Sequence, residues 1–337
     1  MPTVTPQSLQ DTITNIFVRQ GTPDTIAERV AASLVRANLA GHDSHGAVLA
    51  PVYVKKISDG EITPAATPQI RKQEAAVTAI DCKRGFGHIG AVFGVESVIE
   101  QARKNGVATV TLEEVNHVGR VGKYGDLIAR AGLVGLIIVS GTGPEGLVAP
   151  YGGSQRVFGT NPICWSFPRP GEPFPILTDM ATSTIAAGKV SQAKWAGIPV
   201  RPGAILDKHG HPTQDPNDFY DGGTLVPFGE YKGAGLMLAI EIMANLFCGF
   251  APGRSKEHKL GNPTVMTAWD IEAFTDRDRF DRLLNELCER VQANPPAPGF
   301  EEILLPGEIE YRTTEARKKS GIPVPAGLWE ELQRLNE

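Results

Sequence analysis

The sequence has little cysteine, no block of like charge and no long apolar run. Its four cysteines are far apart and form no CxxC pair, so the pattern indicates neither a zinc site nor a disulfide framework. The formal net charge is -5, and lysine and arginine form no cluster, which disfavours nucleic acid and anionic membranes as partners. No basic region followed by an apolar run marks a secretory signal, and the most apolar stretch, residues 132–140, is too short to cross a bilayer. We therefore expect a cytoplasmic globular protein with free thiols.

The first sixty residues show apolar side chains at helical spacing. The spacing predicts helices over residues 6–20, from Pro23 to just before Gly41, and over residues 49–60. Prolines at positions 64 and 68 then mark a connection. We expect a helical region over residues 1–70, packed with the C-terminal segment 298–337, and an α/β region over residues 71–297 that binds cofactor and substrate.

From residue 75 onward, strand patterns alternate with helix patterns, which is typical of an α/β fold. A long polar stretch, residues 194–220, is predicted as loop. The helix predicted over residues 233–248 is polar only at Glu241 and Asn245, so we expect it to be largely buried. The predicted strands are 76–81, 107–112, 134–139, 164–167, 174–179 and 264–271, and the other helices are 90–105, 124–131, 276–293 and 327–335.

A cluster of short polar residues, Gly41-His42-Asp43-Ser44-His45-Gly46, follows the second predicted helix. Glycine suits the left-handed turn after a helix, which places His42 to His45 on a turn where side chains can converge on a pocket. Histidine is the commonest side chain for proton transfer, and Ser44 and Asp43 are within reach to orient a ring. Spacing alone leaves open that the two histidines are ordinary polar loop residues.

Two segments match the dinucleotide-binding pattern GxGxxG. The first, residues 85–90, follows a predicted strand and opens a predicted helix, with Glu113 and Glu114 about twenty residues further on. The second, residues 141–146, is followed by prolines and glycines that break the chain, so we discount it. Chance matches are expected in a chain with 37 glycines.

Further polar clusters lie at the ends of predicted elements. Asn116-His117 follows the second strand of the alternating pattern, where an open α/β sheet commonly binds its ligand. Residues 159–162 form a polar turn, residues 179–183 end a strand, and Lys232-Gly233 opens the apolar helix and offers an anion site. Each cluster also has a plain structural interpretation as a turn, a cap or a solvated side chain.

Together these motifs resemble the malate/L-lactate dehydrogenase family, the type-2 family that also contains ureidoglycolate dehydrogenase, diketogulonate reductase and the cyclic imino acid reductases. Their order and spacing match over nearly the whole chain. The matching motifs are GHDSHG at 41–46, NHVG at 116–119, VAPYGG at 148–153, GTNP at 159–162, DMATS at 179–183, KG at 232–233 and PGE at 306–308.

The resemblance implies a homodimeric enzyme that uses NAD or NADP to interconvert 2-oxo acids and 2-hydroxy acids, or to reduce the equivalent cyclic imines. It also implies an α/β fold specific to the family instead of a Rossmann domain, in which the first glycine pattern is structural. His45 is then the acid/base, Ser44 orients the ring or the carbonyl, and Asp179 tunes an imidazole. The expected substrate contacts are Asn116, His117 and Thr160, and the expected cofactor contacts are Ser140, Asp179, Met180, Ala181, Lys232, Gly233, Pro306, Gly307 and Glu308; no metal is expected.

One departure from the family pattern concerns the substrate. Many members carry an arginine shortly after the SHG triplet, which the resemblance makes a carboxylate clamp, whereas this chain has Ala47, Val48 and Leu49 there. A small dicarboxylate such as oxaloacetate is therefore disfavoured, and a less polar or bulkier oxo acid, or another carboxylate anchor, is favoured. The GHDSHG variant is similar to that of the broad-specificity hydroxycarboxylate dehydrogenases in this family.

Alternatives from other classes stay open. A metal-dependent hydrolase could be built on His42, Asp43, His45 and His117, and a non-catalytic relative would bind a metabolite without turning it over. Within the resembled family, a reductase of pyrroline or piperideine carboxylates is the alternative to the 2-hydroxy acid dehydrogenase. No residue is placed at the ribose 2′ position, where an acidic side chain or an arginine distinguishes NADH from NADPH.

Overall fold

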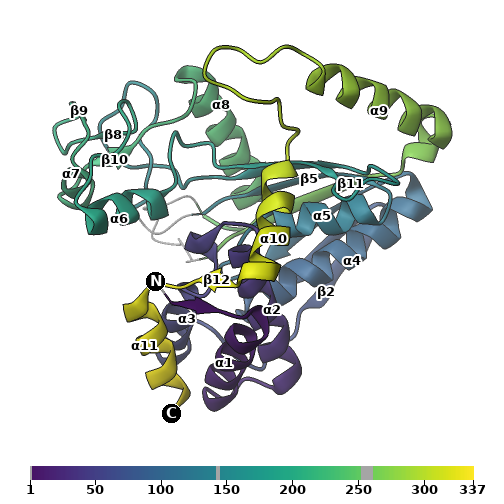
Figure 1. The fold of residues 1–337 in the computed structure, drawn as a ribbon. Coiled ribbons are helices and arrows are strands. Elements are labelled where there is room, and N and C mark those ends of the chain that lie inside the picture. The colour runs from purple at the N-terminus through teal and green to yellow at the C-terminus, as the bar shows by residue number, and fades with distance from the viewer. Residues whose placement is uncertain (1, 142–144, 252–260) are drawn as a thin grey trace.

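A computed structural model describes residues 2–141, 145–251 and 261–337. At its centre is a seven-stranded sheet in the order β2-β3-β4-β11-β5-β6-β7 (Figure 1). The α/β prediction is confirmed, but the sheet is mixed: β3 and β4 pair in parallel and the other neighbours pair antiparallel. The strands are β2 (Gln69–Glu74), β3 (Val77–Asp81), β4 (Val107–Glu113), β5 (Val134–Val139), β6 (Ile163–Phe167), β7 (Ile176–Met180) and β11 (Thr264–Trp269).

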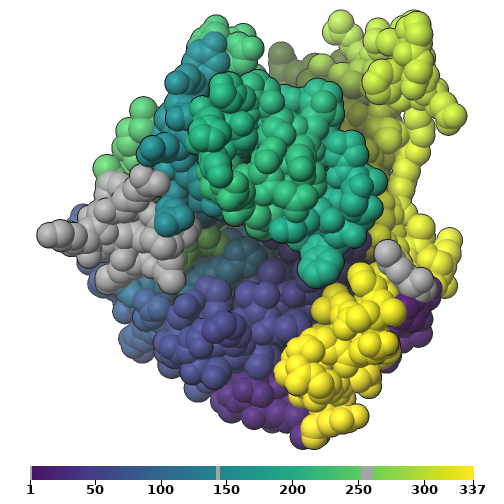
Figure 2. All heavy atoms as spheres, turned by 90° about the vertical axis from the view of Figure 1, so that its left-hand side faces the viewer, coloured from purple at the N-terminus to yellow at the C-terminus, as the bar shows by residue number. Residues whose placement is uncertain are grey.

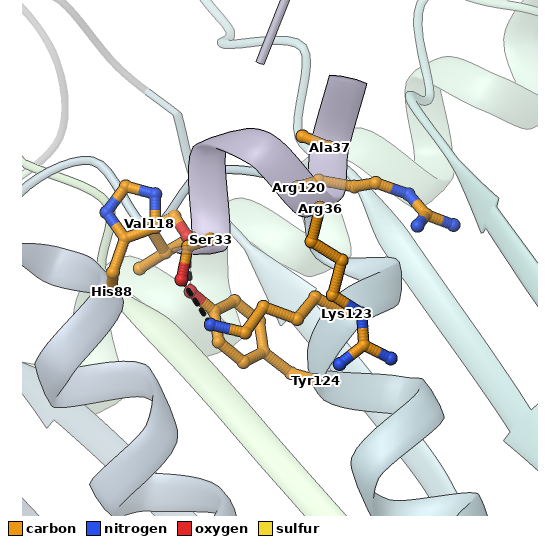
Figure 3. A pocket seen from close by; sticks show the side chains of 8 residues that line it. All are labelled: Ser33, Arg36, Ala37, His88, Val118, Arg120, Lys123 and Tyr124. Carbon is orange, nitrogen blue, oxygen red and sulfur yellow. Dashed lines mark hydrogen bonds between the residues drawn. The ribbon is translucent and has the colours of Figure 1, made fainter. Parts of the chain in front are cut away.

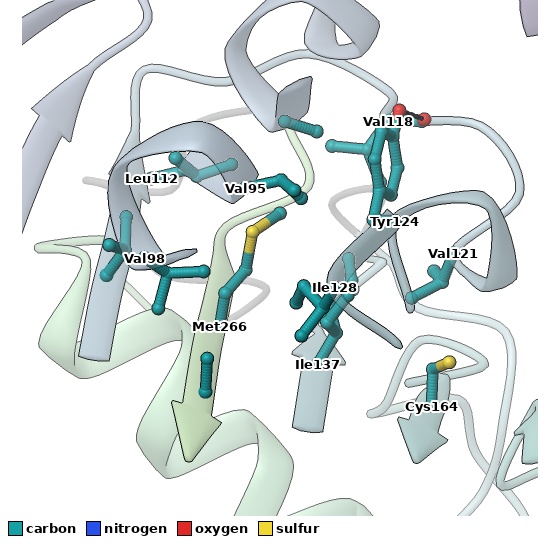
Figure 4. Packing of buried hydrophobic residues seen from close by; sticks show 14 of the residues in the cluster. Val95, Val98, Leu112, Val118, Val121, Tyr124, Ile128, Ile137, Cys164 and Met266 are labelled. Atoms are coloured by element: carbon teal, nitrogen blue, oxygen red, sulfur yellow. Dashed lines mark hydrogen bonds between the residues drawn. The ribbon is translucent and has the colours of Figure 1, made fainter. Parts of the chain in front are cut away.

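Side chains of the central strands alternate between two apolar cores. Met266 and Ile137 pack with α4 (Gly87–Asn105) and α5 (Gly122–Arg130) on one face of the sheet (Figure 4). Their neighbours Val265 and Ile138 point to the opposite face, where they meet α8 (Tyr231–Ile240). This is the two-residue period of a strand covered on both sides.

Helix α4 begins at Gly87, three residues before its predicted start at Gly90, and its first turn is closely packed. A Cβ atom at Gly87 would overlap the carbonyl oxygen of Asn116 and lie 2.5 Å from that of His117. A Cβ at Gly90 would lie 2.5 Å from the sulfur of Cys82. These glycines of the first GxGxxG segment thus let the helix approach the polypeptide after β4. The second segment lies partly outside the described residues.

The N-terminal helices and the C-terminal end of the chain share one apolar core. It joins α1 (Pro6–Arg19), α2 (Asp24–Leu39) and α3 (Leu49–Ser58) to α11 (Ala326–Asn336). β1 (Thr3–Val4) pairs with β12 (Ile322–Pro323), and both chain ends lie in this part of the molecule (Figure 1). The three predicted N-terminal helices agree with the structure.

The polar stretch 194–220 is not all loop, contrary to the prediction. It contains the end of α6 (Ala187–Ala196), the two-residue strands β8 (Ile205–Leu206) and β9 (Pro212–Thr213), and α7 (Pro216–Tyr220). With β10 (Thr224–Leu225) these strands form a small sheet in the order β10-β8-β9. Elements of two to five residues are too short to show a period, so the sequence pattern did not reveal them.

The prediction that the apolar helix after Gly233 is largely buried is wrong. α8 continues into a π-helical segment, η2 (Glu241–Leu246), and Met237, Ile240 and Ala244 are buried. The opposite face is open in this single chain, because only one side of the helix lies on the sheet. Its exposed side chains are Leu238, Ile242, Met243, Leu246 and Phe247.

Two charged helices complete the fold. α9 (Arg277–Gln292) lies far from the N-terminal helices (Figure 1) and buries Cys288. α10 (Glu308–Ser320) packs against α2, although its charged sequence carries no apolar stripe that would predict a helix. The four cysteines are buried free thiols. None of the helices within the described residues has the length and apolar character needed to cross a membrane.

Candidate active site

The polar turn at residues 41–46 is held in place by a charged pair. Gly41 takes a φ of +84° after α2, and the chain then forms a short 3-10 turn, η1 (Asp43–His45). The carboxylate of Asp43 accepts hydrogen bonds from Arg317 Nη1 and Nη2 at 2.7 and 3.0 Å, and from Asn38 Nδ2 at 2.6 Å. A two-pronged pair of this kind fixes direction as well as distance. The turn is therefore tied to α10, about 270 residues away in sequence.

His45 lies at the end of this turn with one ring nitrogen engaged. Its Nδ1 shares a 3.0 Å hydrogen bond with Ser44 Oγ, and its ring stacks on that of His117 with centroids 5.8 Å apart. Desolvation lowers the pKa of His45 below its ordinary value; Asp179 opposes this shift, whereas His42 and Arg120 add to it. Within the described residues, no hydrogen bond reaches Nε2 of His45. That nitrogen is free for a substrate.

His117 is held by a tyrosine from α3. Tyr53 Oη and His117 Nδ1 share a hydrogen bond of 2.6 Å, and Tyr53 is almost fully buried. Desolvation, with a smaller effect from His45, lowers the pKa of His117 to about 3. Burial also raises the pKa of Tyr53 well above its ordinary value. Both groups are therefore neutral at physiological pH, and the stacked pair of histidines can carry a single proton on His45.

Asp179 ends β7 and faces an arginine that the sequence reasoning did not single out. Its Oδ2 accepts a 2.7 Å hydrogen bond from the Gly122 N–H at the start of α5 and lies 3.6 Å from Arg120 Nε. The Arg120 side chain is only 9% exposed, and its Nε and Nη2 have no hydrogen-bond partner among the described residues. The one signal for Arg120 in the sequence is that it directly follows the 116–119 motif.

Asn116 lies next to His117 in the chain, and its side-chain amide serves the backbone, whereas Thr160 accepts hydrogen bonds through its main-chain carbonyl. Asn116 Nδ2 donates to the carbonyl oxygens of three residues, at 2.8 to 3.1 Å. The Thr160 carbonyl accepts from the N–H and the hydroxyl of Thr182. Asn116 therefore holds the chain after β4, and its amide N–H groups are not left for a substrate. The three carbonyls belong to Glu61, Arg84 and Gly85.

Ser140 is enclosed in a separate polar network. Its hydroxyl donates to Glu241 Oε2 at 2.9 Å, and the same oxygen accepts from Asn161 Nδ2 at 2.9 Å. Ser140 and Asn161 are fully buried, and Asn161 adopts an unusual positive φ of +36°. Asn245 also donates to Glu241. The network joins the end of β5 to η2, and it accounts for the two polar residues of the helix predicted over residues 233–248.

The other expected cofactor contacts form two groups. Pro306 and Gly307 lie beside β7, because Leu177 N–H donates to the Pro306 carbonyl at 3.0 Å. Glu308 is buried and uses its carboxylate to accept from the Leu305 N–H and from Arg312. The segment Met180–Ala181 leads to Thr182, whose carbonyl accepts from Phe228 N–H, and Lys232-Gly233 follow on the first turn of α8.

The surface around these groups is hollowed. Figure 2 shows a recess between the purple N-terminal residues and the teal and green residues of α6 and α7. Ser44 marks where the two parts meet, because a Cβ atom at Gly188 would lie 2.8 Å from Ser44 Cβ. A groove of about 440 Å³ also runs between α2, α5, β7 and α10, and its lining includes Arg120, Gly307 and Glu310.

The proposed metal ligands do not converge. His42 Nε2 is 3.1 Å from Glu310 Oε1, and Asp43 is bound by Arg317. In the ranges that the structure describes, no three His, Cys, Asp or Glu side chains are placed to hold a metal ion. This arrangement does not favour the metal-dependent hydrolase.

Comparison with known proteins identifies relatives over the whole chain. The family model for malate/L-lactate dehydrogenase matches residues 4–333. The chain is 35% identical to hydroxycarboxylate dehydrogenase B of Escherichia coli O157:H7, over 97% of this chain and 91% of that protein. The sulfolactate dehydrogenase structure from Methanocaldococcus jannaschii superposes with a TM-score of 0.89 at 32% identity, covering 99% of this chain and 96% of that one. A delta1-piperideine-2-carboxylate reductase from Pseudomonas syringae gives 0.85 at 30% identity, covering 99% and 100%.

Proposed function

The chain belongs to the malate/L-lactate dehydrogenase family, and we propose that it is an NAD(P)-dependent oxidoreductase that interconverts 2-oxo acids and 2-hydroxy acids. The observation that carries the proposal is the arrangement around His45. Its Nδ1 is engaged by Ser44, its Nε2 is free among the described groups, and Asp179 and Arg120 act on its pKa from opposite directions. An imidazole that exchanges one proton at one nitrogen is the group that carbonyl reduction requires.

The nicotinamide supplies or accepts the hydride when the cofactor is bound. During reduction, protonated His45 donates from Nε2 to the oxygen of the substrate carbonyl, and during oxidation neutral His45 takes the hydroxyl proton. Ser44 fixes the rotation of the ring through Nδ1. Asp179 stabilises the protonated ring, and His117, which stays neutral, stacks on it without adding charge.

The residues present fit a dinucleotide. Lys232 is exposed at the start of a ten-residue helix and pairs with no carboxylate in the part of the chain that is described. An ammonium beside the N-terminal N–H groups of a helix is suited to a phosphate. We propose that Lys232-Gly233, the segment Asp179 to Ala181 and the segment Pro306 to Glu308 hold the cofactor, together with the main chain at Ser140, whose hydroxyl donates to Glu241; either NAD or NADP is compatible with these groups.

A reductase of cyclic imines is the alternative substrate class. Its support is the likeness to a delta1-piperideine-2-carboxylate reductase. Such a substrate also has a carboxylate beside a polarised double bond, so His45 and a carboxylate anchor would have the same roles.

Besides its substrate, the proposed partner is a second copy of the chain. We propose no nucleic acid or membrane partner. The exposed apolar residues of α8 and η2, together with Leu283 and Leu287 on α9, support a homodimer, because an apolar patch of this kind commonly marks an interface. Free buried thiols are typical of a reducing compartment such as the cytoplasm. Light scattering on the purified protein tests the dimer, and a monomer at micromolar concentration would contradict it.

The test of the function is the loss of absorbance from NADH and, separately, NADPH. The panel contains pyruvate, phenylpyruvate, oxaloacetate, 2-oxoglutarate, pyrroline-2-carboxylate and piperideine-2-carboxylate. We expect oxidation of one cofactor with a 2-oxo acid, and faster turnover of an imine would select the alternative. If neither cofactor is bound or consumed with any compound, the proposal is wrong.

A further inference from the structure

Arg120 is a buried cation that forms a long ion pair with Asp179 and leaves guanidinium donors unused. It leaves the chain between β4 and α5, and its side chain is 9% exposed. The carboxylate of Asp179 lies 3.6 Å from Nε, beyond hydrogen-bond distance, and Oδ2 already accepts from the Gly122 N–H at 2.7 Å. Nε and Nη2 have no hydrogen-bond partner among the described residues. Buried guanidinium N–H groups that have no hydrogen-bond acceptor are costly unless a ligand supplies one.

Arg120 lines two neighbouring hollows. It shares the first, a cavity the size of one water, with Lys123, Ser33 and His88, and there Lys123 donates to the Ser33 hydroxyl. Figure 3 shows the Arg120 side chain running away from Lys123 and His88. It also lines the groove bounded by Leu177, Gly307 and Glu310. Arg120 thus faces space that a ligand can enter.

Arg120 is also coupled to the acid/base group. It lowers the pKa of His45, whereas Asp179 raises it, so all three charges act on one small region. The charge of Arg120 also helps to lower the pKa of Glu310, which is paired with His42. A substrate carbonyl at His45 Nε2 has its carboxylate one carbon away. His117, whose ring stacks on that of His45, lies only three residues before Arg120, and a guanidinium has the planar donor arrangement and the charge that a carboxylate prefers.

We propose that Arg120 is the group that binds the substrate carboxylate, in place of the arginine absent from residues 47–49. This inference rests on the proposed function, because it assigns a substrate contact to the same site. Asp179 holds the guanidinium from one side, and the substrate carboxylate takes the donors that the protein leaves unused.

The test compares Arg120→Met and Arg120→Lys with the native enzyme on a 2-oxo acid and on its methyl ester, for example pyruvate and methyl pyruvate. Arg120→Met should lower kcat/KM for the acid by roughly 10- to 100-fold, as for loss of a charged hydrogen bond, and leave the ester nearly unchanged. Arg120→Lys keeps the positive charge, so its kcat/KM for the acid should fall less than that of Arg120→Met. Arg334→Met is the matched control, since this arginine lies on α11, is 69% exposed and pairs with Glu331. It should leave the preference for acid over ester intact.

A binding measurement separates this inference from the proposed function. Titration with oxamate, a non-reacting 2-oxo carboxylate, should show binding by the native protein with NADH present, and about the same 10- to 100-fold weakening in Arg120→Met. Oxamate binding that depends on Arg120 supports the inference even if no oxo acid in the panel is turned over. Equal losses for acid and ester, or unchanged oxamate affinity in a folded Arg120→Met, overturn it. Thermal unfolding of each variant confirms folding.

Discussion

Replacing His45 by asparagine should remove proton transfer while keeping a polar side chain of similar size beside Ser44. A positioned acid or base contributes about 10²- to 10⁴-fold to turnover, so kcat should fall by that amount in both directions. The ring makes no hydrogen bond to the cofactor-binding segments within the described residues, so the dissociation constant for NADH should change little. Stopped-flow measurement of hydride transfer, with NADH binding followed by fluorescence, separates the two effects.

The pH profile gives a sharper test, because burial shifts the pKa of His45 in a defined direction. Desolvation lowers this pKa below 6.5, so the ring is neutral at pH 7 and becomes protonated only in more acidic solution. Oxidation requires the neutral ring, so kcat/KM for a 2-hydroxy acid should fall as the pH drops through that pKa and should be level above it. Reduction requires the protonated ring, so its rate should decline as the pH rises past the same value.

Asp179→Asn should shift the pH at which kcat/KM for oxidation falls, which is the acidic limb of the profile, in a defined direction. Asparagine can still accept the Gly122 N–H, but it no longer raises the pKa of His45. The acidic limb for oxidation should therefore shift to lower pH. The reasoning is refuted if the limb persists in His45→Asn, or if Asp179→Asn moves it to higher pH.

Four further outcomes are expected. Tyr53→Phe removes the only hydrogen-bond partner that the described residues give His117 Nδ1 and should cost about 1–3 kcal/mol in denaturant unfolding; an unchanged midpoint would contradict it. Gly87→Ala should destabilise by about 1–3 kcal/mol, because its Cβ would overlap the carbonyl oxygens of Asn116 and His117. Gly327→Ala, with no atom within 4 Å, should stay within about 0.5 kcal/mol in the same assay. Arg317→Met frees the turn that carries His45 and should lower kcat about ten-fold at unchanged NADH affinity; loss of cofactor binding instead would indicate wider disruption. Dialysis against a chelator should leave activity intact, and loss restored by zinc or manganese would revive the metal-dependent alternative.

The sequence predicted the elements that have a clear period and not those that depend on distant contacts. The first three helices, the alternating strands and the glycine after α2 follow from local rules, and the structure agrees with them. α10 was not predicted, because its charged sequence has no apolar stripe and it is held by contacts such as Arg317 to Asp43. The exposed face of α8 and η2 was predicted wrongly, since an apolar sequence does not tell whether a side is covered by the same chain or left open.

The same distinction between local patterns and distant contacts explains which residues of the candidate active site the sequence predicted. The sequence pointed to His45, Ser44, His117 and Asp179, because these residues lie in short motifs, and the structure brings them into one electrostatic neighbourhood. It did not single out Arg120, because an isolated arginine in a loop is normally solvated. Only the fold encloses that guanidinium.

Asp179 connects the two chemical tasks of the proposed site. Its single carboxylate accepts the N–H at the start of α5, lies 3.6 Å from Arg120 and raises the pKa of His45. Because Arg120 lowers that same pKa, a substrate carboxylate that neutralises the guanidinium would remove part of its effect and make His45 easier to protonate. Substrate binding would thus supply the proton donor that reduction needs. The carboxylate of a 2-hydroxy acid would neutralise Arg120 in the same way, so His45 would be a stronger base for its hydroxyl proton.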